Sequence, residues 1–172
     1  DHMADDAGPA DAVTRTPLTC LETTIGSTGT RQAHAAFPAP DGSYILVANQ
    51  NGKRLERIDT DFTTNTFTHN PAEALDLGTC TTPSGRPCED PALRPINWPI
   101  CPIIDSTSTH GFVTLRGGGL FVVNAKTTPM SIVGEYDKTT VRGNGCGGIE
   151  LDGQMYINSG GSPVNVSSTN PH

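Results

Sequence analysis

The 172-residue sequence has no apolar segment long enough to cross a bilayer as a helix, and it has few basic side chains. Its net charge is -7, with 11 Lys and Arg residues against 18 Asp and Glu residues. Proteins hold nucleic acids and anionic lipids largely through the negative charge of those partners, so the electrostatic contribution of this chain would be repulsive. We therefore expect no nucleic-acid partner and no membrane insertion.

Long segments rich in Ala, Glu, Lys and Leu, which are typical of helices, are also missing. Glycine (19) and proline (14) are frequent instead, and they separate short segments that contain many β-branched residues. This arrangement is typical of strands joined by turns. The sequence therefore predicts an all-β protein.

The clearest predicted element is a hairpin within residues 32–51, QAHAAFPAPDGSYILVANQN. An alternating strand, 33–37, leads into the turn Pro40-Asp41-Gly42-Ser43, and a more apolar strand, 44–48, follows the turn. The pattern returns at 109–124 and, more loosely, at 146–158. Small antiparallel sheets repeated at this spacing are the sequence sign of a β-propeller.

The repeats divide the chain into five predicted parts. These are a flexible leader at 1–16, a first blade unit at 17–78 that includes a strand at 18–25, a Cys/Pro-rich insertion loop at 79–102, a second blade unit at 103–145, and a partial third blade with a tail at 146–172. A blade takes roughly 40 to 50 residues, and a closed propeller needs about four to eight blades.

The chain thus holds about three blades of a larger ring. An open arc of blades would expose apolar faces and strand edges to water. We therefore expect a second polypeptide chain or fragment to complete the propeller.

Residues 24–78 carry the landmarks of a known repeat, namely Ile25-Gly26, Pro40-Asp41-Gly42, Val47-Ala48-Asn49 and Ile58-Asp59-Thr60. On these residues the chain resembles the YVTN-type, lactonase-like β-propellers, which have seven blades. Residues 109–158 match more weakly, and Arg31-Gln32-Ala33-His34 stands where a proline is usual. The resemblance implies a fold and leaves the activity open, because this fold hosts many functions.

The cysteines are too widely spaced for a zinc ribbon, and they stand at Cys20, Cys80, Cys88, Cys101 and Cys146. Disulfides persist in oxidising compartments, so this number predicts an extracytoplasmic protein, either periplasmic or secreted. The acidic N-terminal residues do not resemble a signal peptide, and we expect any targeting sequence to have been removed. We expect one disulfide between Cys80 and either Cys88 or Cys101.

Candidate metal ligands stand at the starts of the three repeated segments, at His34, His110 and Cys146. The innermost strand of a propeller blade lines the central channel, so these side chains could converge at the channel mouth. Two imidazoles and a thiolate suit copper or zinc, and His172 could supply a fourth ligand. The alternative is that the histidines hydrogen-bond neighbouring strands, while Cys146 is buried or in a disulfide.

Arg116 lies beside three glycines, where a ligand could approach the backbone closely, although a Gly-rich turn explains the same residues. We predict a propeller segment that binds a small-molecule ligand at the channel mouth, with Arg116 as a contact. The alternatives are a copper-type oxidoreductase that uses His34 and His110, and a lactonase-like hydrolase. His69 is predicted to be a solvated residue of an outer strand.

Overall fold

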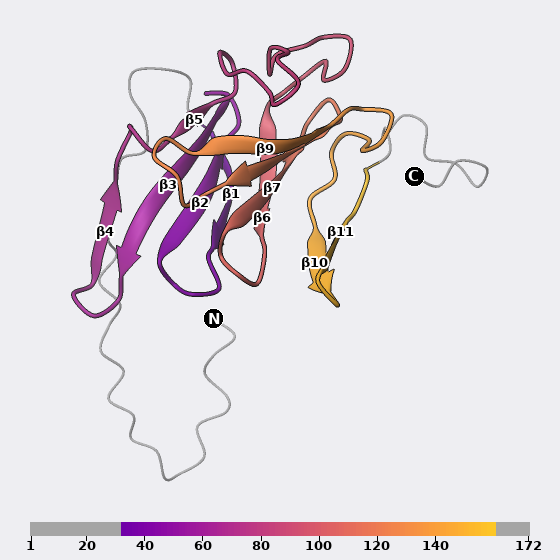
Figure 1. The fold of residues 1–172 in the computed structure, drawn as a ribbon. Coiled ribbons are helices and arrows are strands. Elements are labelled where there is room, and N and C mark those ends of the chain that lie inside the picture. Colours follow the sequence, from indigo (N-terminus) through magenta and orange to yellow (C-terminus); the bar gives the residue numbers. More distant parts are fainter. Residues whose placement is uncertain (1–31, 161–172) are drawn as a thin grey trace, which may run out of the picture.

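The computed structural model describes residues 32–160, and these residues form eleven strands and no helix (Figure 1). The predicted all-β class is therefore confirmed. Within this part of the chain there is accordingly no helix that could span a membrane. All paired strands run antiparallel, as expected for hairpins joined by short turns.

The first sheet has the order β1-β2-β3-β4, and β5 pairs with the other end of β3. Its strands are β1 (Ala33–Pro38), β2 (Tyr44–Asn49), β3 (Arg54–Asp61), β4 (Thr66–His69) and β5 (Leu75–Asp76). The turn between β1 and β2 is stabilised by Asp41, whose Oδ1 accepts a hydrogen bond from the Ser43 amide at 2.9 Å. The predicted strands 33–37 and 44–48 are confirmed as β1 and β2, whereas the predicted strand 18–25 lies outside the described residues.

The second sheet has the order β6-β7-β8-β9. Its strands are β6 (Pro99–Ile104), β7 (His110–Leu115), β8 (Leu120–Asn124) and β9 (Ser131–Tyr136). The sequence prediction missed the start of β6, because it assigned Pro99 and Pro102 to the insertion loop. Proline is tolerated here since β6 is an edge strand whose register shifts between Pro99 and Pro102.

The third sheet is the two-stranded hairpin of β10 (Gly148–Leu151) and β11 (Gln154–Ile157), as predicted. It lies beyond the second sheet (Figure 1). Met155 and Ile157 pack against the cluster formed by Ile100, Cys101 and Ile103 of β6. The sheets of the described chain do not close into a ring.

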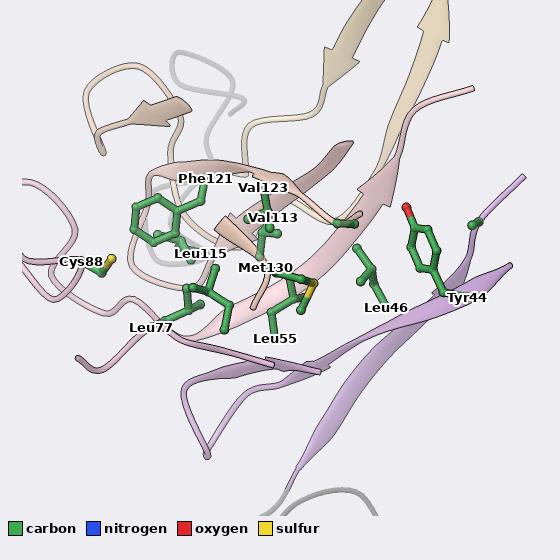
Figure 2. Packing of buried hydrophobic residues seen from close by; sticks show 13 residues of the cluster. Tyr44, Leu46, Leu55, Leu77, Cys88, Val113, Leu115, Phe121, Val123 and Met130 are labelled. Atoms are coloured by element: carbon green, nitrogen blue, oxygen red, sulfur yellow. The ribbon is translucent and has the colours of Figure 1, made fainter. Parts of the chain in front are cut away.

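The main core lies between the first and second sheets (Figure 2). Leu46 and Leu55 come from the first sheet, and Val113, Leu115 and Phe121 come from the second, and all five are fully buried. Alternation along a strand puts every second side chain on one face, so Tyr44 and Leu46 point together toward the second sheet. Removing these apolar side chains from water drives the two sheets together.

A buried carboxylate stabilises the other face of the first sheet. Glu56 is fully buried and accepts hydrogen bonds from Arg54 Nε at 3.0 Å and from His69 Nε2 at 3.1 Å. The prediction that His69 is solvated is wrong, because its pairing opposite Ile58 places the imidazole beside Glu56. A buried carboxylate needs such partners to offset the loss of hydration.

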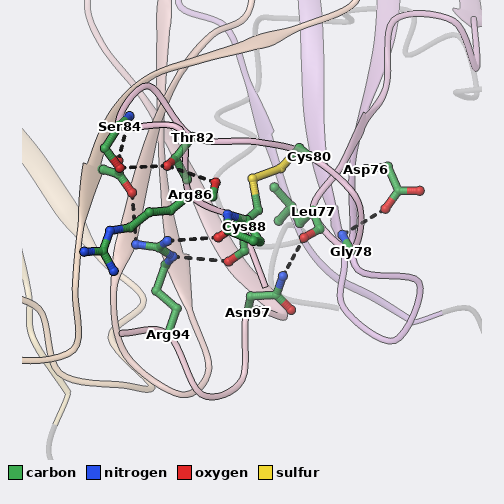
Figure 3. The surroundings of a disulfide bond; sticks show 12 residues. Asp76, Leu77, Gly78, Cys80, Thr82, Ser84, Arg86, Cys88, Arg94 and Asn97 are labelled. Carbon is green, nitrogen blue, oxygen red and sulfur yellow. Dashed lines mark hydrogen bonds and ion pairs between the residues drawn. A yellow bond between two sulfur atoms is a disulfide. The ribbon is translucent and has the colours of Figure 1, made fainter. Parts of the chain in front are cut away.

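Two disulfides stabilise the long connections. Cys80 pairs with Cys88 within the loop that follows β5 (Figure 3), so the first of the two predicted partners is confirmed and Cys101 is not the partner. Cys101 instead pairs with Cys146 and joins β6 to the segment before β10. Both bonds are consistent with an oxidising environment.

The Cys80 loop packs around a buried arginine. Arg94 Nε donates to the Cys88 carbonyl oxygen at 3.2 Å, and its Nη1 forms an ion pair with Glu135 at 3.1 Å (Figure 3). The guanidinium also lies over the Phe121 ring, 5.1 Å from the centroid. The loop is therefore attached to the second sheet by charge as well as by apolar contact.

We predict that the two disulfides contribute unequally to stability. They close segments with sequence separations of 45 residues for Cys101 and Cys146 and 8 residues for Cys80 and Cys88. Loss of loop-closure entropy in the unfolded chain gives about 4 kcal/mol for the longer segment and about 2.5 kcal/mol for the shorter one. Urea unfolding of Cys101→Ser/Cys146→Ser and Cys80→Ser/Cys88→Ser variants measures the difference, and equal or reversed losses would contradict the prediction.

Candidate functional site

Strands β1 and β6 begin side by side at one end of the two sheets. The Nδ1 atom of His34 lies 3.2 Å from the carbonyl oxygen of Ile100. A carbonyl oxygen can only accept, so Nδ1 must carry the proton and the Nε2 atom of a neutral His34 ring is an acceptor. His34 is exposed, so this acceptor is accessible to solvent.

The turn between β7 and β8 lies at the same end. The amide of Arg116 donates to the Trp98 carbonyl oxygen at 2.9 Å, and the amide of Gly117 donates to the Ile96 carbonyl oxygen at 2.9 Å. The exposed Arg116 guanidinium lies over the half-buried Trp98 ring, 5.3 Å from the centroid. Stacking on the indole restricts the orientation of this cation.

The segment after β9 adds two further cations beside this turn. The amide of Lys138 donates to the Leu93 carbonyl oxygen at 2.9 Å, and the Gly119 amide donates to the Val141 carbonyl oxygen at 2.7 Å. Gly118 has φ +96°, and a Cβ atom there would come within 2.8 Å of the Lys138 Cβ. The close approach of the two segments therefore depends on glycine.

We call Arg116, Lys138 and Arg142 the basic cluster. All three are exposed and lie on segments that contact one another. Ion pairs with carboxylates occupy six other cations, which are Lys53, Arg54, Arg57, Arg86, Arg94 and Lys126.

Among residues 32–160, no carboxylate forms an ion pair with Arg116 or Lys138. Asp137 precedes Lys138, but its Oδ1 accepts hydrogen bonds from Thr139 and Thr140, and these bonds hold the pKa of Asp137 below its usual value. Arg116 and Lys138 are thus exposed cations without an ion pair, and Asp137 remains an ionised carboxylate next to Lys138 in the sequence.

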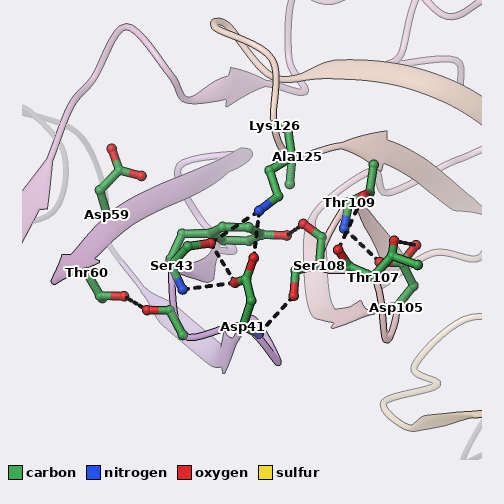
Figure 4. A network of polar contacts seen from close by, with 12 residues as sticks. Asp41, Ser43, Asp59, Thr60, Asp105, Thr107, Ser108, Thr109, Ala125 and Lys126 are labelled. Atoms are coloured by element: carbon green, nitrogen blue, oxygen red, sulfur yellow. Dashed lines mark hydrogen bonds and ion pairs between the residues drawn. The ribbon is translucent and has the colours of Figure 1, made fainter. Parts of the chain in front are cut away.

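The opposite end of the sheets carries a network of polar contacts that joins the β1–β2 turn to the β6–β7 turn (Figure 4). Tyr44 donates its hydroxyl proton to the Ser108 carbonyl oxygen at 2.9 Å, and the Asp41 amide donates to Ser108 Oγ at 3.0 Å. Burial, together with the charges of Asp105 and Asp41, raises the pKa of Tyr44, so its hydroxyl stays a neutral donor. Lys126 Nζ lies 2.8 Å from Asp41 Oδ2.

Asp105 organises the second turn of this network. Its Oδ1 accepts from the amides of Thr109 at 2.8 Å and His110 at 3.1 Å, and its Oδ2 lies 3.0 Å from His110 Nδ1. Burial opposes ionisation of Asp105, but these hydrogen bonds outweigh it and lower the pKa of the carboxyl group. The His110 side chain is 38% exposed.

The structure does not bring the predicted metal ligands together. His34 contacts Ile100, whereas His110 pairs with Asp105 beyond the other end of β6, and a strand rises roughly 3.3 Å per residue, so the two contact points are separated by about 13 Å or more. Cys146 offers no thiolate because it is bonded to Cys101.

The two histidines are not at equivalent positions, because His34 lies on the first strand of its sheet and His110 lies on the second, after the unpredicted start of β6. His172 lies outside the described residues. Within residues 32–160, no group of three or more His, Cys, Asp or Glu side chains is placed to hold a metal ion. The copper or zinc centre stays a prediction from the sequence.

Arg116 lies where a ligand could reach it, and sequence reasoning missed its companions Trp98, Lys138 and Arg142. These residues come from segments separated by up to 44 positions, and none of them belongs to a short motif. The only available signal was that Trp98 is the single tryptophan of the chain.

Comparison with known proteins supports the fold. No protein-family model and no curated protein matches the chain. A solved structure from Bacteroides uniformis, described as a "putative 6-phosphogluconolactonase", is similar with a TM-score of 0.52 and 13% sequence identity. The match covers 76% of this chain and 34% of that protein, so the chain spans about a third of the length of the protein it resembles.

We predict that Asp105 makes stability depend on pH in the acid range. Its pKa is lowered in the folded state, so the stabilisation is present above the unfolded pKa of about 3.9 and is lost as the pH falls through the lower folded value. Asp105→Asn should cost about 1 to 2 kcal/mol at pH 7 and should flatten the fall in stability below about pH 4.

Urea unfolding from pH 2 to pH 7 measures this effect. Asp152→Asn, in the exposed turn between β10 and β11, is the matched control and should keep the wild-type pH profile. If the free energy of unfolding of Asp105→Asn falls below pH 4 as steeply as that of the wild type, the pH dependence does not come from Asp105.

Proposed function

We propose that this chain is a segment of a lactonase-like β-propeller in an extracytoplasmic compartment, and that it binds a small anionic ligand at the end of the sheets that carries the basic cluster. The fold likeness supports the propeller, and the two disulfides support the compartment. In a propeller, the ends of the innermost strands surround the channel mouth. Strands β1 and β6 are the first strands of their sheets, and the basic cluster lies beside the start of β6.

The observation that carries the proposal is the pair of cations without carboxylate partners, Arg116 and Lys138, in a chain of net charge -7. Six other described cations form ion pairs with carboxylates, so Arg116 and Lys138 are distinguished by their lack of such a partner. Uncompensated charge on a folded surface attracts ligands of the opposite sign.

The geometry of Arg116 favours a carboxylate or phosphate group. A guanidinium presents parallel N–H donors that match two oxygens of such a group, and stacking on Trp98 reduces the freedom lost on binding. Lys138 adds a compact charge from the adjoining segment. The similar Bacteroides uniformis protein is named for a phosphorylated sugar lactone, so a phosphorylated sugar acid is the first ligand to test.

Trp98 provides a direct readout of this site, because it is the only tryptophan in the chain. We predict that inorganic phosphate and 6-phosphogluconate produce a saturable change in Trp98 fluorescence at low ionic strength. The double variant Arg116→Gln/Lys138→Gln should bind phosphate and 6-phosphogluconate about tenfold or more weakly, since each substitution removes a close charge contact. Added salt should weaken binding to the wild-type chain through screening.

Lys126→Gln is the matched control, because it removes one positive charge at the opposite end of the sheets, where Lys126 pairs with Asp41. It should leave the phosphate titration unchanged. A wild-type chain without a saturable response, or an equal loss in Lys126→Gln, would overturn the proposal.

The proposed propeller also requires a second polypeptide chain or fragment. Ile149, Leu151 and Tyr156 lie on the face of the third sheet that points away from Met155 and Ile157, and they are 67%, 58% and 54% exposed. In the first sheet, by contrast, the face that carries Tyr44 and Leu46 is covered by the second sheet. A further blade packed on this hairpin would remove the three side chains from water.

We predict that the 172-residue chain alone self-associates as its concentration rises, because this face is uncovered. Ile149→Thr/Leu151→Thr/Tyr156→Thr should reduce the association while keeping strand propensity. Size-exclusion chromatography with light scattering measures the mass, and Phe62→Thr, another exposed apolar position, is the control. A wild-type chain that stays a monodisperse 18.1 kDa monomer would contradict the prediction.

The metal-dependent oxidoreductase and the lactonase-like hydrolase stay predictions from the sequence. The exposed His34 Nε2 acceptor is compatible with the second of these, but no observation of the site ranks it above binding.

A further inference from the structure

The Cys101–Cys146 disulfide connects the two sides of the basic cluster. Cys101 is fully buried in β6, three residues after Trp98. Cys146 is exposed and follows directly on the segment that carries Lys138 and Arg142. One covalent bond therefore ties the cationic segment to the strand that positions the tryptophan.

We infer that the thiol or disulfide state of Cys101 and Cys146 controls anion binding at the basic cluster, an inference that rests on the proposed function. The disulfide limits how far residues 137–146 can move from β6. Without it, Arg142 and the hairpin that follows are held to the second sheet by noncovalent contacts alone.

Those contacts include the Lys138 amide bonded to the Leu93 carbonyl oxygen, the Gly119 amide bonded to the Val141 carbonyl oxygen, the Ser106 amide bonded to Glu150, and the packing of Met155 and Ile157 on the β6 cluster. The Arg142 amide donates to Ser159 Oγ, but Ser159 belongs to the same segment beyond the disulfide, so this bond moves with the loop. A two-stranded hairpin is at best marginally stable by itself.

The exposed position of Cys146 makes the bond accessible to a dithiol reductant. The thiolate of the dithiol attacks Cys146 Sγ, the S–S bond breaks, and Cys101 Sγ leaves as a thiolate that takes up a proton. The second thiol of the reagent then attacks the mixed disulfide and releases Cys146, so that the protein disulfide gains two electrons and the reagent is oxidised to its own disulfide. The buried Cys101 sulfur is shielded from direct attack.

The consequence is a weaker site in the reduced chain. When residues 142–146 are no longer tied to β6, Arg142 lies closer to bulk solvent and farther from Arg116, whereas Lys138 stays bonded through its amide to the Leu93 carbonyl oxygen. Losing one close charge contact weakens binding by about tenfold. Stacking of Arg116 on Trp98 does not depend on the disulfide, so part of the site persists.

The test is a titration with inorganic phosphate at low ionic strength, followed by Trp98 fluorescence. It compares the oxidised chain, the dithiol-reduced chain and Cys146→Ser, all in a Cys20→Ser background so that the fifth cysteine cannot exchange. Cys146→Ser keeps Cys101 as a small buried side chain, which limits the damage to packing. Cys80→Ser/Cys88→Ser is the matched control for loss of a disulfide elsewhere.

We expect the reduced chain and Cys146→Ser to bind phosphate about tenfold more weakly than the oxidised chain, and Cys80→Ser/Cys88→Ser to bind as the oxidised chain does. Equal affinity in the oxidised and reduced chains would overturn this inference and leave the proposed anion site intact. An equal loss in Cys80→Ser/Cys88→Ser would also overturn it, because the effect would then be general destabilisation. Absence of binding to the oxidised chain would instead overturn the proposed function.

Discussion

Face-to-face packing of the first sheet against the second is the interaction on which the remaining structure depends. Leu46 and Leu55 on one side and Val113 and Phe121 on the other are fully buried in this layer (Figure 2). The same packing sets β1 beside β6, so that the ends of the two sheets face the same directions. The polar network of Tyr44 and Ser108 then fixes one end, while the other end is left with exposed cations.

The two ends of the sheets differ in the contacts that their charged side chains make. At the Asp105 end, the carboxylate oxygens already have partners, because Asp105 contacts the Thr109 amide and the His110 ring and Asp41 pairs with Lys126. At the Trp98 end, the turn amides are used by backbone carbonyls, and the guanidinium of Arg116 has an aromatic ring as its contact. This difference is the physical basis for placing the ligand at the second end. The fold alone would not decide it, because this architecture hosts many activities.

Local signals predicted the hairpins well. The Pro40-Asp41-Gly42-Ser43 turn and the alternation around it were enough to place β1 and β2 within one residue, and the looser repeat at 146–158 contains the hairpin of β10 and β11. The start of strand β6 was not predicted, because Pro99 and Pro102 are normally evidence against a strand. Its edge position and shifted register accommodate the two prolines.

That one missed strand changed the interpretation of the site. Without the start of β6, the sequence pattern placed His110 at the same position in its sheet as His34, and Cys101 was not recognised as the disulfide partner of Cys146. The basic cluster could not have been predicted, since its members come together only through contacts between segments distant in sequence. Exposure of Cys146, burial of Cys101 and the location of Trp98 likewise depend on tertiary packing.

We propose Arg116, stacked on Trp98, as the anion contact of this chain. Arginine side-chain Nε–H resonances, observed by nuclear magnetic resonance during addition of phosphate, test it directly. We predict selective shifts of the Arg116 Nε–H and of the Trp98 indole N–H, while the ion-paired Arg57 and Arg94 signals stay unchanged. Uniform small shifts of all arginines, or shifts that spare Arg116, would contradict it.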